Sequence, residues 1–569
     1  MSPLVRGRFT GWAALLLLLA LARSQAASGL IEFKLGRFQE ISLIENVSFD
    51  AFLWNIPRNV TFIIIQVHTQ YVNTTLSFNK IPTRLMSMTG QDPGLLLRLK
   101  PEENSLMWHL RSLAGDASAT SVILPYNERD PVPGGCNLQS DLPVDVSLYL
   151  QYNMYEATIS FAPANVGYAR GAVPPACDIG EGSGERWRLR YHIYQYFLPE
   201  TDLTVKVLLT ALQKMADVKQ VEANGVKLFS LGAQDKPSVS VSSIPGQGVI
   251  YNVIVTDPAL NTSAAYSPVH TYGCNFTATL DNCYMGRRIS TRIFFASAGL
   301  VGLFICFFGH RYLKTELFFM GFTFMGFLFF VLIIRTVTME LDYEVVLSLV
   351  AVAGFAGGGL LVTCWWRLGS VAFCMLVVGL VLGFLLSSLV FFTPLGNLSA
   401  FHDDVVFWVV FTSVALLVPL VFFSCPRALN ITSCGFVGSY AVILAIHNFV
   451  YTSLAYITLN ILKRALNDSF NTAYTNVPFQ MNDYVLITVW VVLLVCGMVV
   501  QFHREKGQPI FPSSPYQTWK RDRERRRTNI LDPSHHIPPL KDRMKNALTG
   551  VQRLFTKRQP AGEQTPLLL

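Results

Sequence analysis

Four polar side chains interrupt the sixth of seven long apolar runs, and their types and spacing are the best suited to chemistry in this chain. Tyr440, His447 and Tyr451 recur at i, i+7 and i+11, on one helix face, with Asn448 adjacent. Ionisable groups at membrane depth usually face a cavity or a partner. The face is a candidate proton or ligand site, but we favour an ordinary hydrogen-bonded link between helices.

The histidines do not have the spacing of a metal site. His310 and His402 fall on opposite membrane sides in the topology given below, and the pair His535-His536 lies in a proline-containing tail. No two histidines of the apolar block stand at helical ligand spacing. An acid, base and metal set typical of an intramembrane hydrolase is also missing. We therefore expect no enzyme activity, no metal and no cofactor.

Asn-x-Ser/Thr sequons indicate glycosylation of an exported segment. Five precede the apolar block and two lie in loops expected on the same side: Asn46, Asn59, Asn73, Asn261, Asn275, Asn397 and Asn467. A further sequon at Asn430 would face the cytosol, so we expect it to carry no glycan.

Four of the ten cysteines lie in the exported segment: Cys136, Cys177, Cys274 and Cys283. An even number in an oxidising compartment indicates two disulfides, with three connectivities open. We expect Cys136 to pair with Cys177 and Cys274 with Cys283, because each pair brackets one loop-rich stretch. The six remaining cysteines are expected to be buried apolar thiols.

The elements that position these residues begin with the apolar block. A helix rises about 1.5 Å per residue, so runs of roughly 17 to 25 residues span a hydrocarbon layer of about 30 Å. Lipid offers the backbone no hydrogen bonds, so such runs form helices. Seven are expected, at 293–309, 317–334, 345–364, 368–392, 405–423, 429–457 and 484–500.

An exported amino end and seven spans place the carboxyl end in the cytosol. Most of the tail's Lys and Arg then lie inside, as the positive-inside rule prefers. Within the block, Gly354 and Gly358, extended by Gly357 and Gly359, and Gly379 with Gly383 form small-residue pairs. Small residues allow close helix approach, so we expect the third and fourth helices to pack tightly.

The first half of the chain is expected to be an all-β ectodomain. Runs rich in β-branched residues at 60–72 and 249–255 and period-two alternation at 144–150 predict strands. A faint repeat, ending at Pro57 and at Pro199, suggests two tandem β-sandwiches. The predicted divisions are a signal peptide at 1–24, sandwiches at 25–170 and 185–292 around a Gly/Pro linker at 171–184, the seven-helix domain at 293–502 and a basic tail at 503–569.

The tail carries much of the net charge of +8, with fourteen Lys and Arg against six Asp and Glu after residue 502. Its cluster at 520–527 is expected to attract anionic lipid, with nuclear import as the competing interpretation and no nucleic-acid domain indicated. Residues 541–558 have the pattern of a basic interfacial helix. Glu563, Leu567 and Leu568 match an acidic dileucine signal that a trafficking adaptor would bind.

The signal peptide, the glycosylated β ectodomain and the basic tail are accompanied by two motifs, Gly354-Phe355-Ala356-Gly357-Gly358-Gly359 and Cys364-Trp365-Trp366-Arg367. Through these features, the whole chain resembles the family transmembrane seven superfamily member three. The resemblance implies a non-enzymatic multi-pass glycoprotein that promotes cell survival, attenuates endoplasmic-reticulum stress and the unfolded-protein response, inhibits cytokine-induced death of pancreatic β cells and promotes insulin secretion. It carries over no functional residue.

The sequence is unlike rhodopsin-type receptors, because the third helix ends without an Asp-Arg-Tyr-like triplet. We expect a receptor-like or scaffolding protein that binds a lumenal or extracellular protein, with a transporter or channel lined by the sixth helix as the alternative. Its expected location is the cell membrane, with endosomes or lysosomes second and the nuclear envelope disfavoured.

Overall fold

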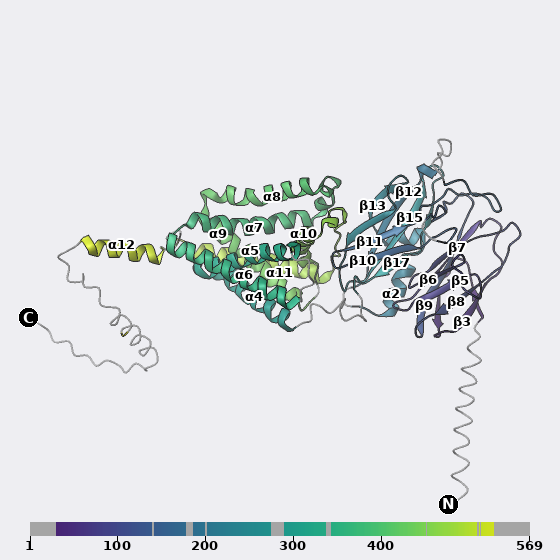
Figure 1. Cartoon of the computed structure of the whole chain (residues 1–569), viewed down its shortest axis with the longest axis horizontal. Helices are drawn as coiled ribbons and strands as arrows, with labels where there is room; N and C mark the ends of the chain where they lie inside the picture. Colours follow the sequence, from purple (N-terminus) through teal and green to yellow (C-terminus); the bar gives the residue numbers. More distant parts are fainter. Residues whose placement is uncertain are drawn as a thin grey trace, which may run out of the picture.

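The structure is a computed structural model that describes residues 30–138, 141–177, 186–199, 202–274, 289–336, 343–450, 452–508, 511, 514–528 and 545. The expected signal peptide, Cys283, Asn275, Tyr451, the sorting signal and all of the 541–558 segment except Lys545 lie outside these residues. A β-rich ectodomain stands at one end of a helical bundle, and the tail helix leaves from the other end (Figure 1).

The first ectodomain unit is a sandwich of two sheets. One sheet has the strand order β1 (Leu30–Phe33), β3 (Ser48–Leu53), β8 (Leu106–Ser112), β5 (Thr74–Ser77) and β6 (Ser87–Gly90). The other has the order β2 (Gln39–Leu43), β9 (Ala117–Tyr126), β4 (Phe62–His68) and β7 (Gly94–Arg98). The alternation of side chains sends Ile63 and Ile65 of β4 into the core between the sheets, together with Trp108.

The second unit also contains two sheets. One has the order β10 (Leu148–Tyr152), β11 (Glu156–Phe161) and β14 (Ser238–Ser242). The other has the order β13 (Val226–Gly232), β12 (Arg190–Phe197), β15 (Val249–Asp257) and β16 (Thr262–Ala265), and β17 (Val269–Thr271) also pairs with β15. Helices α2 (Val205–Gln213) and α3 (Val218–Asn224) cover this larger sheet with their apolar faces.

The two units share a core. Every residue of β4 is buried, because Phe62 and Ile64 point away from the first core and belong to the same buried cluster as Tyr191 and Tyr251 of the second unit. An ordinary sandwich strand exposes one face to water. The two sandwiches are therefore packed against each other through a sheet that is buried on both sides.

The expectation of two sandwiches is confirmed, but the predicted boundary between them is wrong. Strand β11 pairs with β14 in the register Ile159↔Val239, so residues 148–161 belong to the second unit rather than to the first. The Gly/Pro-rich stretch at 171–184 consequently interrupts the second unit and does not link two domains. Residues 171–177 contain no helix or strand, as the composition predicted, and 178–184 lie outside the described residues. Strand partners about 80 residues apart leave no local signal.

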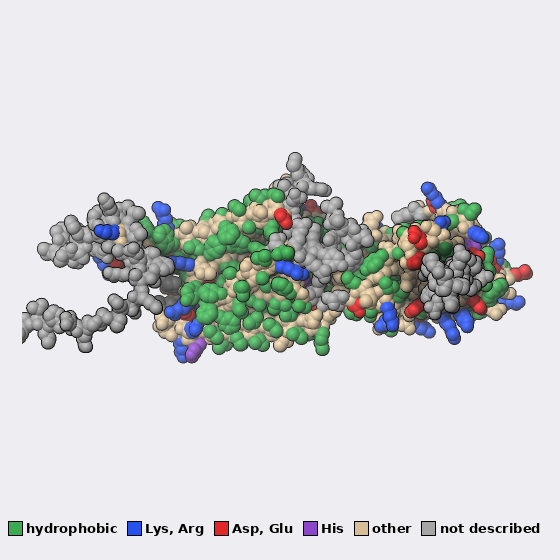
Figure 2. Space-filling view, turned by 90° about the horizontal axis from the view of Figure 1, so that it is seen from below, with side chains coloured by type: hydrophobic (Ala, Val, Ile, Leu, Met, Phe, Trp, Pro, Cys, Tyr) green, Lys and Arg blue, Asp and Glu red, His purple; other side chains and the backbone are tan. Residues whose placement is uncertain are grey.

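The part of the chain that the structure describes contains seven helices long and apolar enough to cross a membrane, which confirms the expected number. They are α4 (Ile289–Phe308), α5 (Leu313–Thr336), α6 (Tyr343–Thr363), α7 (Val371–Phe392), α8 (Asp404–Val421), α9 (Pro426–His447) and α11 (Met481–Arg504). Hydrophobic side chains cover the flank of the bundle in Figure 2. The central helices are α7 and α9, since 61% of each span is buried against 17% for α8.

Two details of the bundle differ from expectation. The sixth run does not continue to residue 457: α9 ends at His447, and the separate helix α10 (Tyr456–Leu466) occupies part of the expected loop. The glycine pairs act as predicted but on other partners. A β-carbon on Gly358 would meet Phe318 of α5, and one on Gly383 would meet Ala415 of α8, so α6 packs on α5 and α7 on α8.

Candidate functional site

The junction between ectodomain and bundle is built around Tyr474, in the loop between α10 and α11. Its backbone N–H donates to the carbonyl of Ser240 at 3.0 Å, and its carbonyl accepts from the N–H of Ser242 at 2.9 Å. The loop therefore adds a parallel bridge to the edge of β14. The Tyr474 ring also stacks on Phe229 of the second sandwich with 4.0 Å between ring centroids.

A buried lysine strengthens this junction. Lys463 of α10 is 7% exposed, and its Nζ donates to Ser242 Oγ at 3.0 Å and to the carbonyl of Ser243 at 2.5 Å. Ser242 Oγ lies 3.4 Å from Asn460 Oδ1, so it can accept from the lysine while donating to the amide. Burial lowers the pKa of Lys463 from its ordinary 10.5 to about 7.

The helix that carries Lys463 is held by the bundle. Arg464 donates through Nε and NH2 to Asp404 Oδ1 of α8, at 3.0 and 2.9 Å. The hydroxyl of Tyr440 on α9 donates to the carbonyl of Leu454 at 3.1 Å, just before α10. The junction therefore runs without a gap from β14 through α10 to α8 and α9.

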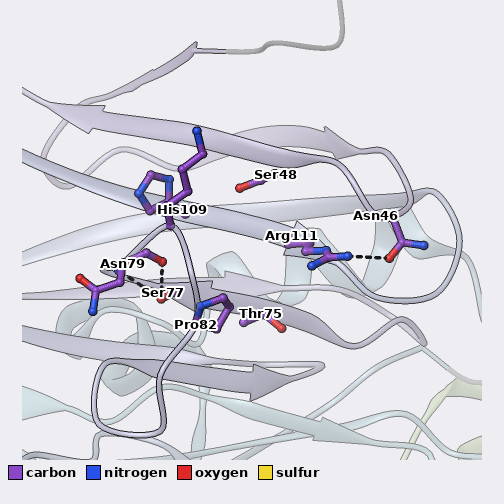
Figure 3. Close-up of a pocket in the computed structure, with 9 residues that line it drawn as sticks. Asn46, Ser48, Thr75, Ser77, Asn79, Pro82, His109 and Arg111 are labelled. Carbon is purple, nitrogen blue, oxygen red and sulfur yellow. Dashed lines mark hydrogen bonds between the residues drawn. The ribbon is translucent and has the colours of Figure 1, made fainter.

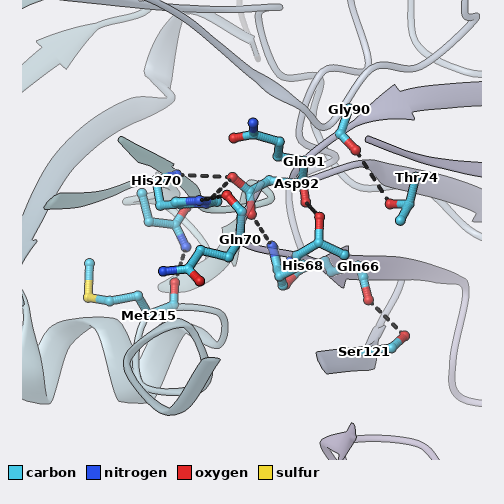
Figure 4. A network of polar contacts seen from close by, with 12 residues as sticks. Gln66, His68, Gln70, Thr74, Gly90, Gln91, Asp92, Ser121, Met215 and His270 are labelled. Atoms are coloured by element: carbon cyan, nitrogen blue, oxygen red, sulfur yellow. Dashed lines mark hydrogen bonds and ion pairs between the residues drawn. The ribbon is translucent and has the colours of Figure 1, made fainter. Parts of the chain in front are cut away.

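A second buried polar site joins the two sandwiches (Figure 4). The carboxylate of Asp92, after the first sandwich's β6, lies between two histidines: Oδ1 is 2.8 Å from Nδ1 of His68 on β4, and Oδ2 is 2.7 Å from Nδ1 of His270 on β17. Nε2 of His270 lies 3.1 Å from the carbonyl of Gln70. Carboxylate and carbonyl oxygens only accept, so His270 carries protons on both ring nitrogens and is charged.

The charges of this interdomain site shift its titration. Burial raises the pKa of Asp92, but the charge and hydrogen bond of His270 and the contact with His68 outweigh it and lower the pKa to about 2. Burial lowers the pKa of His270, yet the charge and hydrogen bond of Asp92 raise it above its ordinary value. The interface is thus held by an ion pair whose members come from different sandwiches.

The polar face predicted on the sixth helix is not brought together as one site. Tyr440 bonds to Leu454 and Thr458 near α10, His447 Nδ1 lies 3.2 Å from Thr452 Oγ1, and Asn448 donates to the carbonyl of Leu444. These contacts are local links within and between helices. Tyr451, the remaining member of the predicted face, lies outside the described residues.

Sequence reasoning missed a polar cluster at the opposite end of the bundle. Glu316 was assigned to a loop, but it lies in the first turn of α5 and is fully buried. Asn430, expected only to lack a glycan, is also fully buried, and its Nδ2 donates to Glu316 Oε2 at 2.9 Å. The available signal was a lone carboxylate directly before an apolar run.

Some of the predicted disulfide and glycosylation sites lie in the described residues, and others lie outside them. Cys136 and Cys177 form the expected disulfide, and Cys274 is disulfide-bonded, but its predicted partner Cys283 lies outside the described residues. The other six cysteines are free, but the expectation that all would be buried is wrong: Cys364 is half-buried, Cys425 and Cys496 are exposed, and only Cys306, Cys374 and Cys434 are buried. The four described sequons of the ectodomain are all exposed: Asn46, Asn59, Asn73 and Asn261.

The bundle sequons have different surroundings. Asn397 and Asn467 are both half-buried. Asn397 Nδ2 donates to the carbonyl of Thr475 at 3.1 Å, beside the junction. Glycan occupancy of these residues stays a prediction.

A shallow pocket of about 200 Å³ opens on the first sandwich between β3, β5 and β8 (Figure 3). Arg111 NH2 donates to Asn46 Oδ1 at 3.1 Å at its edge. A glycan on Asn46 would grow from this rim, so we do not assign the pocket a ligand. Among the described residues, no group of three His, Cys, Asp or Glu side chains could hold a metal ion.

The tail begins with a docked helix, α12 (Pro515–Thr528). Just before it, Ser514 Oγ donates to the carbonyl of Trp366 at 2.7 Å, and Gln517 Nε2 of its first turn donates to that of Leu368 at 2.9 Å. The start of the basic cluster, from Lys520 to Arg525, is exposed beyond this anchor.

Comparisons with known proteins match the chain along almost its whole length. Family models match residues 29–126 (TM7SF3-like, N-terminal immunoglobulin-like domain), 131–277 (TM7SF3-like, second immunoglobulin-like domain) and 295–502 (TM7S3/TM198-like domain). The first two place the boundary between the sandwiches where the strand pairing does.

Curated relatives agree. The rat protein Transmembrane 7 superfamily member 3 is 56% identical over 96% of this chain and 97% of its own length. The human protein of the same name is 55% identical over 96% of this chain and 95% of its own. The alignment with a solved Bacteroides uniformis beta-glucuronidase covers 41% of this chain and 25% of the enzyme, with 8% identity and a TM-score of 0.17. This similarity is too weak to indicate a fold or a function.

Proposed function

Because the chain belongs to the transmembrane 7 superfamily member 3 family, we propose that it is a non-enzymatic, receptor-like or scaffolding membrane protein whose ectodomain binds a protein partner. The observation that supports this proposal best is the bridge between Tyr474 and β14. A binding domain that only tethers a partner needs no fixed contact with its anchor. A domain that transmits a conformational change to the bundle does need such a contact.

Physical continuity supports coupling across the junction. The second sandwich contacts Tyr474 in the loop after α10 and Lys463 on α10, and α10 is fixed to α8 by Arg464. The first sandwich is expected to move together with the second, because the two share a core. A partner that displaces either sandwich would therefore press on the ends of α8 and α9.

The finer proposals rest on the family. A pro-survival role, with attenuated endoplasmic-reticulum stress, protection of pancreatic β cells and insulin secretion, is supported by the resemblance and by no residue contact. The terminal Glu563, Leu567 and Leu568 support routing to endosomes or lysosomes through a trafficking adaptor. The exposed basic residues from Lys520 to Arg525 of α12 support contact with anionic lipid on the cytosolic side.

The transporter alternative gains no support from the described part of the chain, since Tyr440 and His447 have their hydrogen bonds occupied locally. Replacing His447 by Ala would leave flux and pH response unchanged if this is right.

The test of coupling uses the intact protein in nanodiscs. A pull-down with the ectodomain first identifies a saturable partner, and amide hydrogen exchange then measures protection at the start of α11 with and without it. Tyr474→Pro removes the N–H that donates to Ser240, whereas Tyr474→Ala keeps both backbone bonds and serves as the matched control.

We expect the partner to change exchange in the wild type and in Tyr474→Ala, and to have no such effect in Tyr474→Pro. An unchanged bundle in the wild type, despite saturated binding, would contradict the coupling proposal.

A further inference from the structure

The buried cluster at the tail end of the bundle combines side chains from three helices and a turn. Asn430 of α9 donates through Nδ2 to Glu316 of α5 and to Nδ1 of His310, in the turn between α4 and α5, each at 2.9 Å. The backbone N–H of His310 donates to Oε1 of Gln501 on α11 at 3.1 Å. All four side chains are at most 2% exposed.

Three oxygens of this region have no hydrogen-bond partner although they are buried: Glu316 Oε1, Asn430 Oδ1 and Ser433 Oγ. Asn430 and Ser433 are three residues apart on α9, so their side chains project to the same side of the helix. Glu316 Oε1 belongs to the carboxyl whose other oxygen is bonded to Asn430. Unpaired buried polar atoms are costly. Glu316 Oε1 and Asn430 Oδ1 only accept, so they lack a donor or a cation, whereas the Ser433 hydroxyl can donate or accept.

The amide of Asn430 cannot be reversed to remove this demand. While Glu316 is ionised, reversal would turn Oδ1 toward its carboxylate, and two acceptors would then face each other. Since Nδ1 of His310 accepts from Asn430, its ring proton is on Nε2 and the ring is neutral. The thiol of Cys434, which also lies beside Glu316, and the amide of Gln501 bring no positive charge.

We propose that Glu316, Asn430 and Ser433 form a binding site for one small monovalent cation, Na⁺ or a proton, at the tail end of the bundle. The charge fits: within the described surroundings the site has a single carboxylate, and its other free ligands are neutral oxygens. Divalent ions in proteins generally collect several carboxylates. The bound cation neutralises Glu316 and stabilises its contact with Asn430, which joins α5 to α9.

The site also touches the tail. The ring of Phe511 lies 5.5 Å from that of His310, between the last spanning helix and α12. The cluster therefore lies beside the segment that leads into α12.

Thermal unfolding of the full-length protein in zwitterionic nanodiscs tests this site. One series exchanges Na⁺ for N-methylglucamine at constant ionic strength and pH, and another varies pH without Na⁺. The variants are Glu316→Gln, which keeps the size and removes the charge, and Asp522→Asn, which removes an exposed carboxylate of α12 as control.

If the site binds Na⁺, the melting temperature of the wild type rises by about 3–5 °C for each tenfold increase in Na⁺ concentration above the dissociation constant. In the proton case, it falls with rising pH and ignores Na⁺. Glu316→Gln abolishes the response and Asp522→Asn retains it. Equal responses of the wild type and Glu316→Gln to both series would overturn the proposal.

If Glu316→Gln does not accumulate, Ser433→Ala replaces it and removes one oxygen of the site. We expect its response to need roughly tenfold more cation, or to shift by about one pH unit. An unchanged midpoint would equally overturn the proposal.

Discussion

Replacing Asp92 by Asn is expected to loosen the interface between the two sandwiches and to change its pH dependence. The carboxylate is 4% exposed and touches two histidines that are 1% and 2% exposed. Removing one partner of a buried, hydrogen-bonded charge pair typically costs about 3–5 kcal/mol, because the remaining charge stays buried without compensation. A lowering of the pKa from 3.8 to about 2 corresponds to roughly 2.5 kcal/mol, which is of the same order.

The direction of the pH effect follows from both groups. The folded state lowers the pKa of Asp92, so its contribution is present above pH 3.8 and is lost as the pH falls toward 2. The folded state raises the pKa of His270, so its contribution is complete below pH 6.5 and is lost as the pH rises through the folded value. The interface is therefore expected to be most stable in mildly acidic conditions, between about pH 4 and 6.5.

Thermal unfolding of the intact protein, followed by the fluorescence of the ectodomain, measures this from pH 4 to 9. Asp92→Asn should lower the ectodomain transition by roughly 10 °C near pH 6 and flatten its fall toward alkaline pH. The matched control is Asp50→Asn, which removes a similar contact with His109 at 2.7 Å, but with a carboxylate that is 43% exposed. It should cost under about 1 kcal/mol. Equal losses for the two variants would refute the reasoning.

Three further changes have expected outcomes. Lys463→Met should remove a rise in stability between pH 7 and 10.5, worth up to about 5 kcal/mol, because only the unfolded chain keeps this proton across that window; melting curves of variant and parent over the window check it. Gly383→Ala should destabilise the bundle by about 1–3 kcal/mol, since its β-carbon would overlap the backbone of Ala415, whereas Gly359→Ala, which meets nothing within 4 Å, should melt like the parent. Asn430→Gln should leave glycosidase-sensitive gel mobility unchanged, because the amide is buried and bonded, while Asn46→Gln should increase mobility; a glycan on Asn430 would reverse the assigned topology.

Much of the bundle could be predicted because lipid imposes a rule on each segment separately. A run of about 20 apolar residues must satisfy its own backbone hydrogen bonds, so 317–334 predicts α5 without knowledge of any neighbour. The same rule wrongly predicted one helix over 429–457, because hydrophobicity alone does not show where a helix ends and the chain changes direction. The chain turns after His447 and starts α10, and only packing reveals that change.

The partners of the small residues were beyond a local rule. Gly358 and Gly383 predict close approach, but which helix approaches depends on the order of the helices around the bundle. The prediction paired α6 with α7, whereas the close approaches join α6 to α5 and α7 to α8.

The sequence by itself predicted the number of spanning helices and the two sandwiches from composition and periodicity, and it favoured the Cys136–Cys177 bond among three open connectivities. Only the tertiary structure decided that β11 belongs with β14, that Tyr474 joins the ectodomain, and that Glu316 meets Asn430. Those contacts join residues about 80 to 230 positions apart. Their stability comes from burial and hydrogen bonding between segments that are far apart in the sequence, and neither segment contains a local pattern that identifies its partner.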